Sequence, residues 1–68
     1  MKNIDVRGLN CPEPVILVKK AMESGEKEIE AIADAKVAVE NITRLCNKMG
    51  YSIEVNMKDG DFVLSIKK

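Results

Sequence analysis

The chain has 68 residues, enough for one small domain, and its 11 basic and 11 acidic residues cancel to no net charge. This balance argues against a protein that binds a nucleic-acid backbone, which needs an excess of positive charge, and only one Tyr and one Phe are available to stack on bases. With two cysteines and no histidine, the chain lacks the residues for a disulfide-rich scaffold or the usual zinc site, so no metal and no cofactor are expected.

The sequence carries no basic-then-apolar signal segment and no apolar run long enough to span a membrane. We therefore expect a cytoplasmic protein whose thiols stay reduced. It has no linker, repeat or low-complexity stretch, so residues 1–68 are expected to form a single domain.

The first part of the chain predicts a strand followed by a helix. Ile4 and Val6 alternate with polar residues, as in a half-buried strand, and Gly8 then permits a turn. Helical spacing runs from position 12 to about position 24, and prolines suit its first turn because their missing N–H groups would be unpaired there. Its apolar face is expected to hold Pro14, Leu17, Val18 and Ala21, with Val15 and Met22 at the edges, and Gly25 to end it.

Residues 28–33 predict a second strand and residues 35–49 a second helix. In the strand, Ile29, Ala31 and Ala33 face inward, and Ile32 is interpreted as a lone exposed apolar residue. Asp34 is interpreted as the N-cap of the helix; the alternative is that it lies near a functional site. The apolar stripe of this helix comprises Ala35, Ala38, Ile42, Leu45, Cys46 and Met49, flanked by Val39, with Val37 off the stripe and Gly50 at the end.

The last part of the chain predicts a β-hairpin. Asp59-Gly60 is a strong signal for a two-residue turn between two alternating segments. This turn sets Met57 opposite Phe62, Val55 opposite Leu64 and Ile53 opposite Ile66, all on one face that we expect to be buried.

The element order is therefore β-α-β-α-β-β. The first β-α-β unit should join parallel strands through a right-handed crossover. Because each strand has one apolar and one largely polar face, both helices should cover the same side of the sheet. The predicted fold class is α+β, as a two-layer sandwich.

Cys11 is the candidate reactive residue. It lies in the first β-α turn, where α/β proteins often place their sites, and at a helix start, where the partial positive charge favours a thiolate. Pro12 and Pro14 stiffen the turn and leave the N–H groups of Cys11 and Glu13 as donors near the sulfur. Arg7 would favour the thiolate and Glu13 would oppose it. The alternative is a structural cysteine at a helix start, with no chemistry.

The residues that the chain lacks limit the reactions that Cys11 can carry out. Without histidine there is no Cys–His pair for hydrolysis, and position 14 is proline, so there is no Cys-x-x-Cys dithiol. Cys46 lies in an apolar stripe and is interpreted as a small buried hydrophobic residue. A lone thiolate without a base suits transfer of a sulfur atom between thiols.

The segment from Asp5 to Val15, with its Gly-Leu-x-Cys-Pro-x-Pro core, resembles the signature of the TusA/SirA/YedF family of small sulfur-carrier proteins. The resemblance implies a four-stranded mixed sheet in the order 1-2-4-3 with both helices on one side. It also implies that Cys11 carries a persulfide, that Gly8, Pro12 and Pro14 shape its turn, and that the partners are a cysteine desulfurase-like donor and a DsrE-like acceptor. In the best-known branch of the family the sulfur serves tRNA thiolation.

The stretch from Asp34 to Arg44 is more similar to the YedF-type domain, although Ala35 stands where that pattern often has Asn. That branch includes proteins of selenium metabolism with a second, DsrE-like domain, so sulfur and selenium both stay open. Whether the chain acts as an enzyme or as a pure carrier also stays open. The alternative function is a non-catalytic regulatory or interaction module that uses either Val37 or the polar outer sheet face, formed by Asn3, Glu28, Glu30, Glu54 and Asn56.

Overall fold

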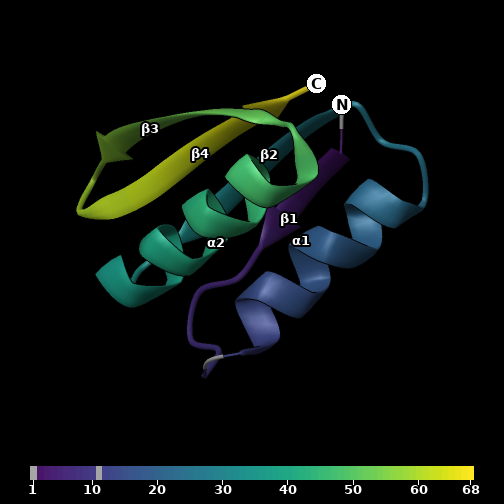
Figure 1. Cartoon of the computed structure of the whole chain (residues 1–68). Helices are drawn as coiled ribbons and strands as arrows, with labels where there is room; N and C mark the ends of the chain where they lie inside the picture. The colour runs from purple at the N-terminus through teal and green to yellow at the C-terminus, as the bar shows by residue number, and fades with distance from the viewer. Residues whose placement is uncertain (1, 11) are drawn as a thin grey trace.

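The computed structural model of this chain describes residues 2–10 and 12–68. The elements are β1 (Lys2–Asp5), α1 (Glu13–Glu23), β2 (Glu28–Ala33), α2 (Lys36–Met49), β3 (Ser52–Lys58) and β4 (Asp61–Lys67). The strands form one mixed sheet in the order β1-β2-β4-β3, and both helices pack on the same face of it (Figure 1). The predicted α+β fold, its strand order and its two layers are confirmed.

The sheet combines one parallel pair and two antiparallel pairs. β1 runs parallel to β2, with Ile4 opposite Ala31, and the N–H of Val6 extends this ladder by donating to the carbonyl of Ile32 at 2.9 Å. β4 runs antiparallel to both β2 and β3. β1 and β3 are consequently the two edges of the sheet, and β1 is only four residues long.

The ends of α1 follow from its prolines and its glycine. Pro12 occupies the N-cap and Pro14 the second helical position, where neither removes an internal hydrogen bond. After Ser24, Gly25 takes a left-handed conformation with φ of +95°. The N–H of Gly25 then donates to Met22 and that of Glu26 to Ala21, a Schellman motif that satisfies the last carbonyls. The prediction that the helix ends at Gly25 is confirmed.

The hydrophobic core lies between the helices and the inner sheet face. The helices contribute Pro14, Val18, Ala21, Met22, Ala38, Ile42, Leu45 and Cys46 to it. Leu17 was expected there but is 37% exposed, because it lies beside the short edge strand β1, next to Ile4, where no further strand covers it. Ala35 was also expected in the core but is exposed, because it precedes the first turn of α2. Val37 lies off the stripe, as predicted.

Ile32 is less exposed than predicted. The inward residues of β2 are fully buried, as expected, and Ile32 points to the opposite face. There it is half-buried because Val63 of β4 and Asp5 of β1 lie directly opposite it. It is therefore part of a small covered spot and not a lone exposed residue.

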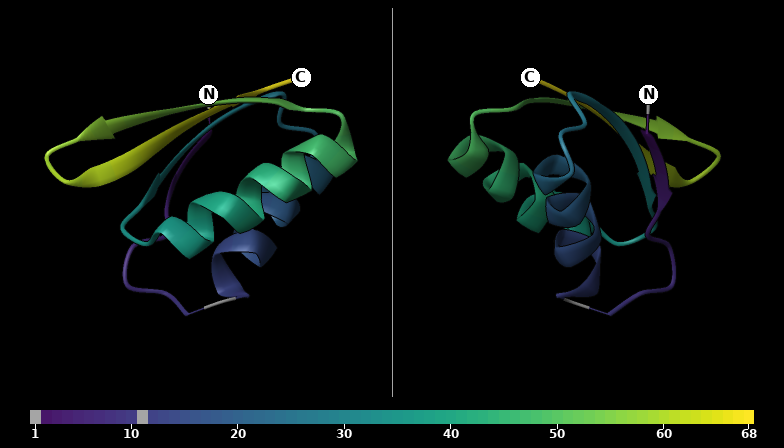
Figure 2. Two further views of the ribbon diagram at one scale, coloured as in Figure 1. Left: turned by 60° about the vertical axis from the view of Figure 1, so that its left-hand side comes forward. Right: turned by 90° about the vertical axis from the view of Figure 1, so that its right-hand side faces the viewer.

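The hairpin has the predicted register but not the predicted burial. Asp59 and Gly60 both have positive φ, at 52° and 84°, which fits a two-residue turn, and Met57 pairs with Phe62. Leu64 and Ile66, in the middle and at the far end of β4, are fully buried, whereas Met57 near the turn is 66% exposed. The reason is that the hairpin extends beyond the helix layer, as Figure 2 shows.

Candidate functional site

The segment that connects β1 to α1 is anchored before it reaches position 11. Val6 is almost fully buried, and its N–H is bonded to β2. Leu9 is half-buried against the core, while Asn10 is exposed. Cys11 itself lies outside the described residues, so the structural account concerns the segments on either side of it.

Gly8 and Asp34 are joined across 26 positions of the sequence. The N–H of Gly8 points between the two carboxylate oxygens of Asp34, at 3.3 and 3.2 Å. Gly8 has a φ of +75°, and an added Cβ would meet no atom within 4 Å, so glycine is favoured here by backbone conformation and not by lack of space.

This contact corrects the interpretation of Asp34 as a helix cap. The N-cap of α2 is Ala35, and no side chain caps that helix end. Asp34 lies between β2 and α2 and uses its carboxylate to hold the loop that leads to Cys11. Because β1 runs parallel to β2, the carboxyl ends of both strands lie at the same end of the sheet, and this brings Gly8 and Asp34 together.

Arg7 ties the same loop to the start of β4. Its guanidinium donates to Asp5 at 2.8 and 3.0 Å and to Asp61 at 3.0 Å, and its backbone N–H also donates to Asp5 at 3.0 Å. The hydrogen bonds from Arg7 lower the pKa of Asp5 to about 2, and the two carboxylates raise the pKa of Arg7. The positive charge of Arg7 is therefore matched by two carboxylates that the sequence pattern did not pair with it.

The first turn of α1 corrects one further expectation. The N–H of Glu13 donates to the carbonyl of Asn10 at 2.9 Å, so it is already used within the turn and is not a free donor. The carbonyl of Pro12 accepts the N–H of Ile16 at 3.1 Å. Pro14 is fully buried, whereas Pro12 and Glu13 are exposed. One proline thus anchors the helix in the core while the other stays at the surface beside position 11.

Two shallow hollows between α1 and α2 adjoin this turn. Both are lined by Val15 and Asn41; the first also includes Leu9, Pro14, Ala35, Val37 and Ala38, and the second Pro12, Arg44, Leu45 and Lys48. The second contains only cationic charges among its lining residues, and Arg44 also donates to Asn41 at 3.2 Å. The first hollow is therefore lined mainly by apolar side chains, and the second carries the positive charges of Arg44 and Lys48.

Cys46 has the properties predicted for an inert thiol. Its side chain is fully buried in the core, and this burial raises its pKa to about 11. At neutral pH the thiol is protonated and shielded from reagents, so Cys46 is not a candidate for thiol chemistry.

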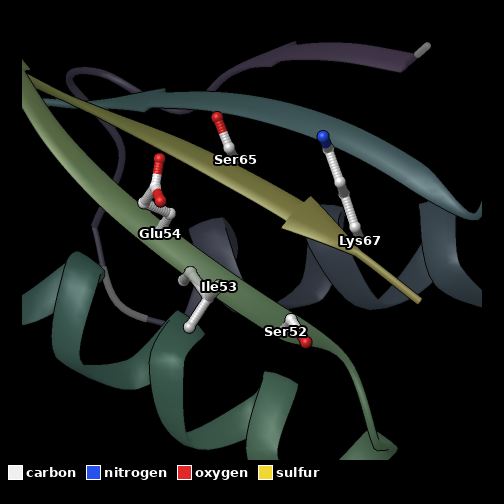
Figure 3. A pocket seen from close by; sticks show the side chains of 5 residues that line it. All are labelled: Ser52, Ile53, Glu54, Ser65 and Lys67. Atoms are coloured by element: carbon white, nitrogen blue, oxygen red, sulfur yellow. The ribbon is translucent and has the colours of Figure 1, made fainter.

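A further hollow lies on the hairpin, lined by Ser52, Ile53, Glu54, Ser65 and Lys67. Figure 3 shows Glu54, Ser65 and Lys67 projecting from one side of the strands, with Ile53 pointing toward the helices. Among residues 2–10 and 12–68, those that line this hollow are polar or apolar side chains without a thiol.

Among residues 2–10 and 12–68, no three cysteine or carboxylate side chains gather as metal ligands. Neither of the helices described is long and apolar enough to cross a bilayer.

Comparisons with known proteins agree with the resemblance drawn from the motif. The family model described as "Sulfurtransferase TusA" matches residues 2–68. A protein of Methanocaldococcus jannaschii named "Putative sulfur carrier protein" is 42% identical, over 100% of this chain and 95% of its own length. A protein of Archaeoglobus fulgidus with the same description is also 42% identical, over 94% and 86% of the two chains. The crystal structure of a SirA-like protein from Desulfitobacterium hafniense superposes with a TM-score of 0.89 at 35% identity, covering 98% of this chain and 96% of the other.

Proposed function

The chain belongs to the TusA sulfurtransferase family, and from this premise we propose that it is a sulfur carrier that holds a transferable sulfur atom as a persulfide on Cys11. The observation that carries the proposal is the Gly8–Pro14 segment, with its single cysteine, set on a family-typical fold. The curated relatives are named for sulfur carriage, and the only other cysteine of this chain is buried and protonated.

The proposed transfer consists of two displacements at sulfur. The Cys11 thiolate attacks the terminal sulfur of a donor persulfide, so a new S–S bond forms while the donor S–S bond breaks and the donor leaves as a thiolate. An acceptor thiolate then attacks the terminal sulfur on Cys11 in the same way and releases the Cys11 thiolate. Each step exchanges one S–S bond for another, so no external oxidant, reductant or cofactor is needed.

The surroundings support this chemistry by restraining the chain on both sides of Cys11. Before it, Gly8 is bonded to Asp34 and Arg7 to two carboxylates. After it, Pro14 is buried at the start of α1. Fixed flanking segments reduce the conformational freedom that the loop must lose when a partner's sulfur approaches, which favours transfer.

The partners proposed for this carrier are proteins. A cysteine desulfurase-like donor would load Cys11, and a DsrE-like protein would accept the sulfur. The hollows between α1 and α2 are the surfaces next to the motif that such proteins could contact. We further propose that residues 1–68 act as one domain and that selenium is an alternative cargo.

Loading by a cysteine desulfurase and cysteine, followed by intact-mass measurement, tests the proposal. We expect one added sulfur on the wild-type chain and on Cys46→Ser, and none on Cys11→Ser. Repeating the reaction with selenocysteine would show whether one selenium is added at the same residue. Equal loading of the wild-type and Cys11→Ser chains would overturn the assignment.

The competing function, a non-catalytic interaction module, makes a different prediction for thiol reactivity. Cys11 of a carrier should react with iodoacetamide faster than the cysteine of an unstructured peptide, because a helix start favours the thiolate. A rate no faster than that of the peptide, together with a failure to load sulfur, would favour the module.

A further inference from the structure

β3 presents an open edge of the sheet. It is the last strand in the order β1-β2-β4-β3, it is seven residues long, and its register with β4 continues without a bulge from Ser52 to Lys58. It also contains no proline. Natural proteins usually shorten, bulge or cover such edges, because unpaired backbone groups can bind another strand. The opposite edge, β1, has only four residues.

The unpaired backbone groups belong to the odd-numbered residues of β3. Lys58 and Asp61 flank the two-residue turn and therefore form a hydrogen-bonded pair. Hydrogen-bonded and non-hydrogen-bonded pairs alternate along an antiparallel ladder. The N–H and C=O groups of Ile53, Val55 and Met57 consequently point away from β4, toward the free edge.

The side chains near the same edge are apolar on the helix side of the sheet. Val55 is 40% exposed and Met57 is 66% exposed, because the hairpin extends beyond α2. These are two of the five large hydrophobic residues that the described part of the chain exposes. The residues with free backbone groups therefore also carry the uncovered apolar surface.

The opposite face of β3 carries complementary charges at a fixed spacing. Glu54 and Lys58 are both exposed, with Asn56 midway between them. Both ion pairs found among residues 2–10 and 12–68 involve Arg7, so neither Glu54 nor Lys58 belongs to one.

We propose that the β3 edge is a self-association surface, on which a second copy of this chain adds its own β3 antiparallel, with the two-fold axis at Asn56. In this register Glu54 lies opposite Lys58 of the partner subunit, and the arrangement repeats on the other side of the axis. Val55 then lies opposite Met57 of the partner subunit on the helix side, in hydrogen-bonded pairs. The result is one eight-stranded sheet with all four helices on the same face.

Alternative registers satisfy fewer of these groups. A shift that centres the axis on Val55 places Glu54 opposite Asn56 and Lys58 opposite Ser52, so no opposite charges face each other directly. If the two β3 strands shift by one residue relative to each other, the apolar side chains of one strand lie on the same face as the polar side chains of the other. Charge and apolar surface therefore select the same register.

The dimer is expected to be weak. Stable complexes typically bury about 800 Å² of surface per partner, and pairing through one strand edge buries less than this. Association should therefore depend on concentration, and it should not depend on sulfur chemistry, because Cys11 takes no part in it.

Sedimentation equilibrium in the presence of a reductant tests the pairing by charge exchange. The wild-type chain should shift from monomer to dimer as concentration rises. Glu54→Lys and Lys58→Glu should each associate at least tenfold more weakly, because like charges then face each other. An equimolar mixture of these two variants should recover association, and so should the chain that carries both changes. A wild-type chain that stays monomeric at about 1 mM, or variants that all associate equally, would overturn the proposal.

A cysteine cross-link tests the register. Opposed residues of a non-hydrogen-bonded pair have Cβ atoms about 4.5–5.5 Å apart, close to disulfide geometry. In a Cys11→Ser background, Asn56→Cys should form a disulfide dimer on mild oxidation, whereas Lys67→Cys on β4 should not. Equal cross-linking of the two variants would show random collision and would also overturn the proposal.

Discussion

Removing the carboxylate of Asp34 should loosen the loop before Cys11 without unfolding the domain. In Asp34→Ala, the N–H of Gly8 loses its acceptor. The group is exposed, so water replaces the carboxylate and the loss should be about 1 kcal/mol, the usual net value of one hydrogen bond. With a urea m-value of about 1 kcal/mol per M for a chain of this size, the unfolding midpoint should fall by about 1 M.

Amide hydrogen exchange locates the effect. A loss of about 1 kcal/mol corresponds to roughly fivefold faster exchange at Gly8. The N–H of Ala38, which donates to the carbonyl of Ala35 in the first turn of α2, should exchange at an unchanged rate. Asp34→Asn keeps an acceptor oxygen and should retain most of the protection at Gly8.

The control is Glu40→Ala, which removes an exposed carboxylate from α2. It should change stability by less than about 0.5 kcal/mol and leave the exchange of Gly8 unchanged. If Asp34→Ala left Gly8 unchanged and instead accelerated exchange of Ala38, Asp34 would be acting through the helix, and the account given for this contact would be refuted.

Two further predictions concern the stability of the sheet. The pKa of Asp5 is lowered from 3.8 to about 2, so its ionised form stabilises the fold above pH 3.8, and this contribution is lost as the pH falls toward 2. Urea midpoints measured across this range should therefore fall less steeply with pH for Asp5→Asn than for the wild-type chain. Equal slopes for the two chains would contradict the role of the Arg7 contact. Leu64→Ala in the core should lower the free energy of unfolding by about 3 kcal/mol. Met57→Ala, measured at a dilution that keeps the chain monomeric, should lower it by less than about 1 kcal/mol. Equal losses for the two variants in urea unfolding would contradict the difference in burial.

Alternation and helical spacing predicted every element of the fold. The two-residue turn at Asp59-Gly60 fixed the hairpin register, because a tight turn leaves one way to pair the strands. The order of the strands came from the family resemblance, since periodicity does not say which strands are neighbours. The prediction that Cys11 is the reactive residue rests on the sequence and its motif, and Cys11 lies outside the described residues.

The burial predictions for Leu17 and Met57 were wrong because burial depends on how far the covering helix or strand extends. Helical spacing placed Leu17 on the apolar face, but β1 is too short to cover it. Alternation placed Met57 on the inner face, which is correct, but the hairpin extends beyond the helix layer there, so no helix covers Met57. A pattern gives the direction in which a side chain points, whereas its burial depends on what another element places there.

The sequence by itself determined the element types, the inward faces, the hairpin and the Gly8–Pro14 motif, because these depend on contacts between neighbouring residues. Only the tertiary structure decided that Asp34 holds Gly8 and that Arg7 joins Asp5 to Asp61, since those partners lie 26 and 54 positions apart. They meet because the parallel pairing sets the carboxyl end of β1 beside that of β2, and the antiparallel pairing of β4 with β2 places the start of β4 at the same end of the sheet. The surroundings of the motif are therefore a property of strand order, which local periodicity does not encode.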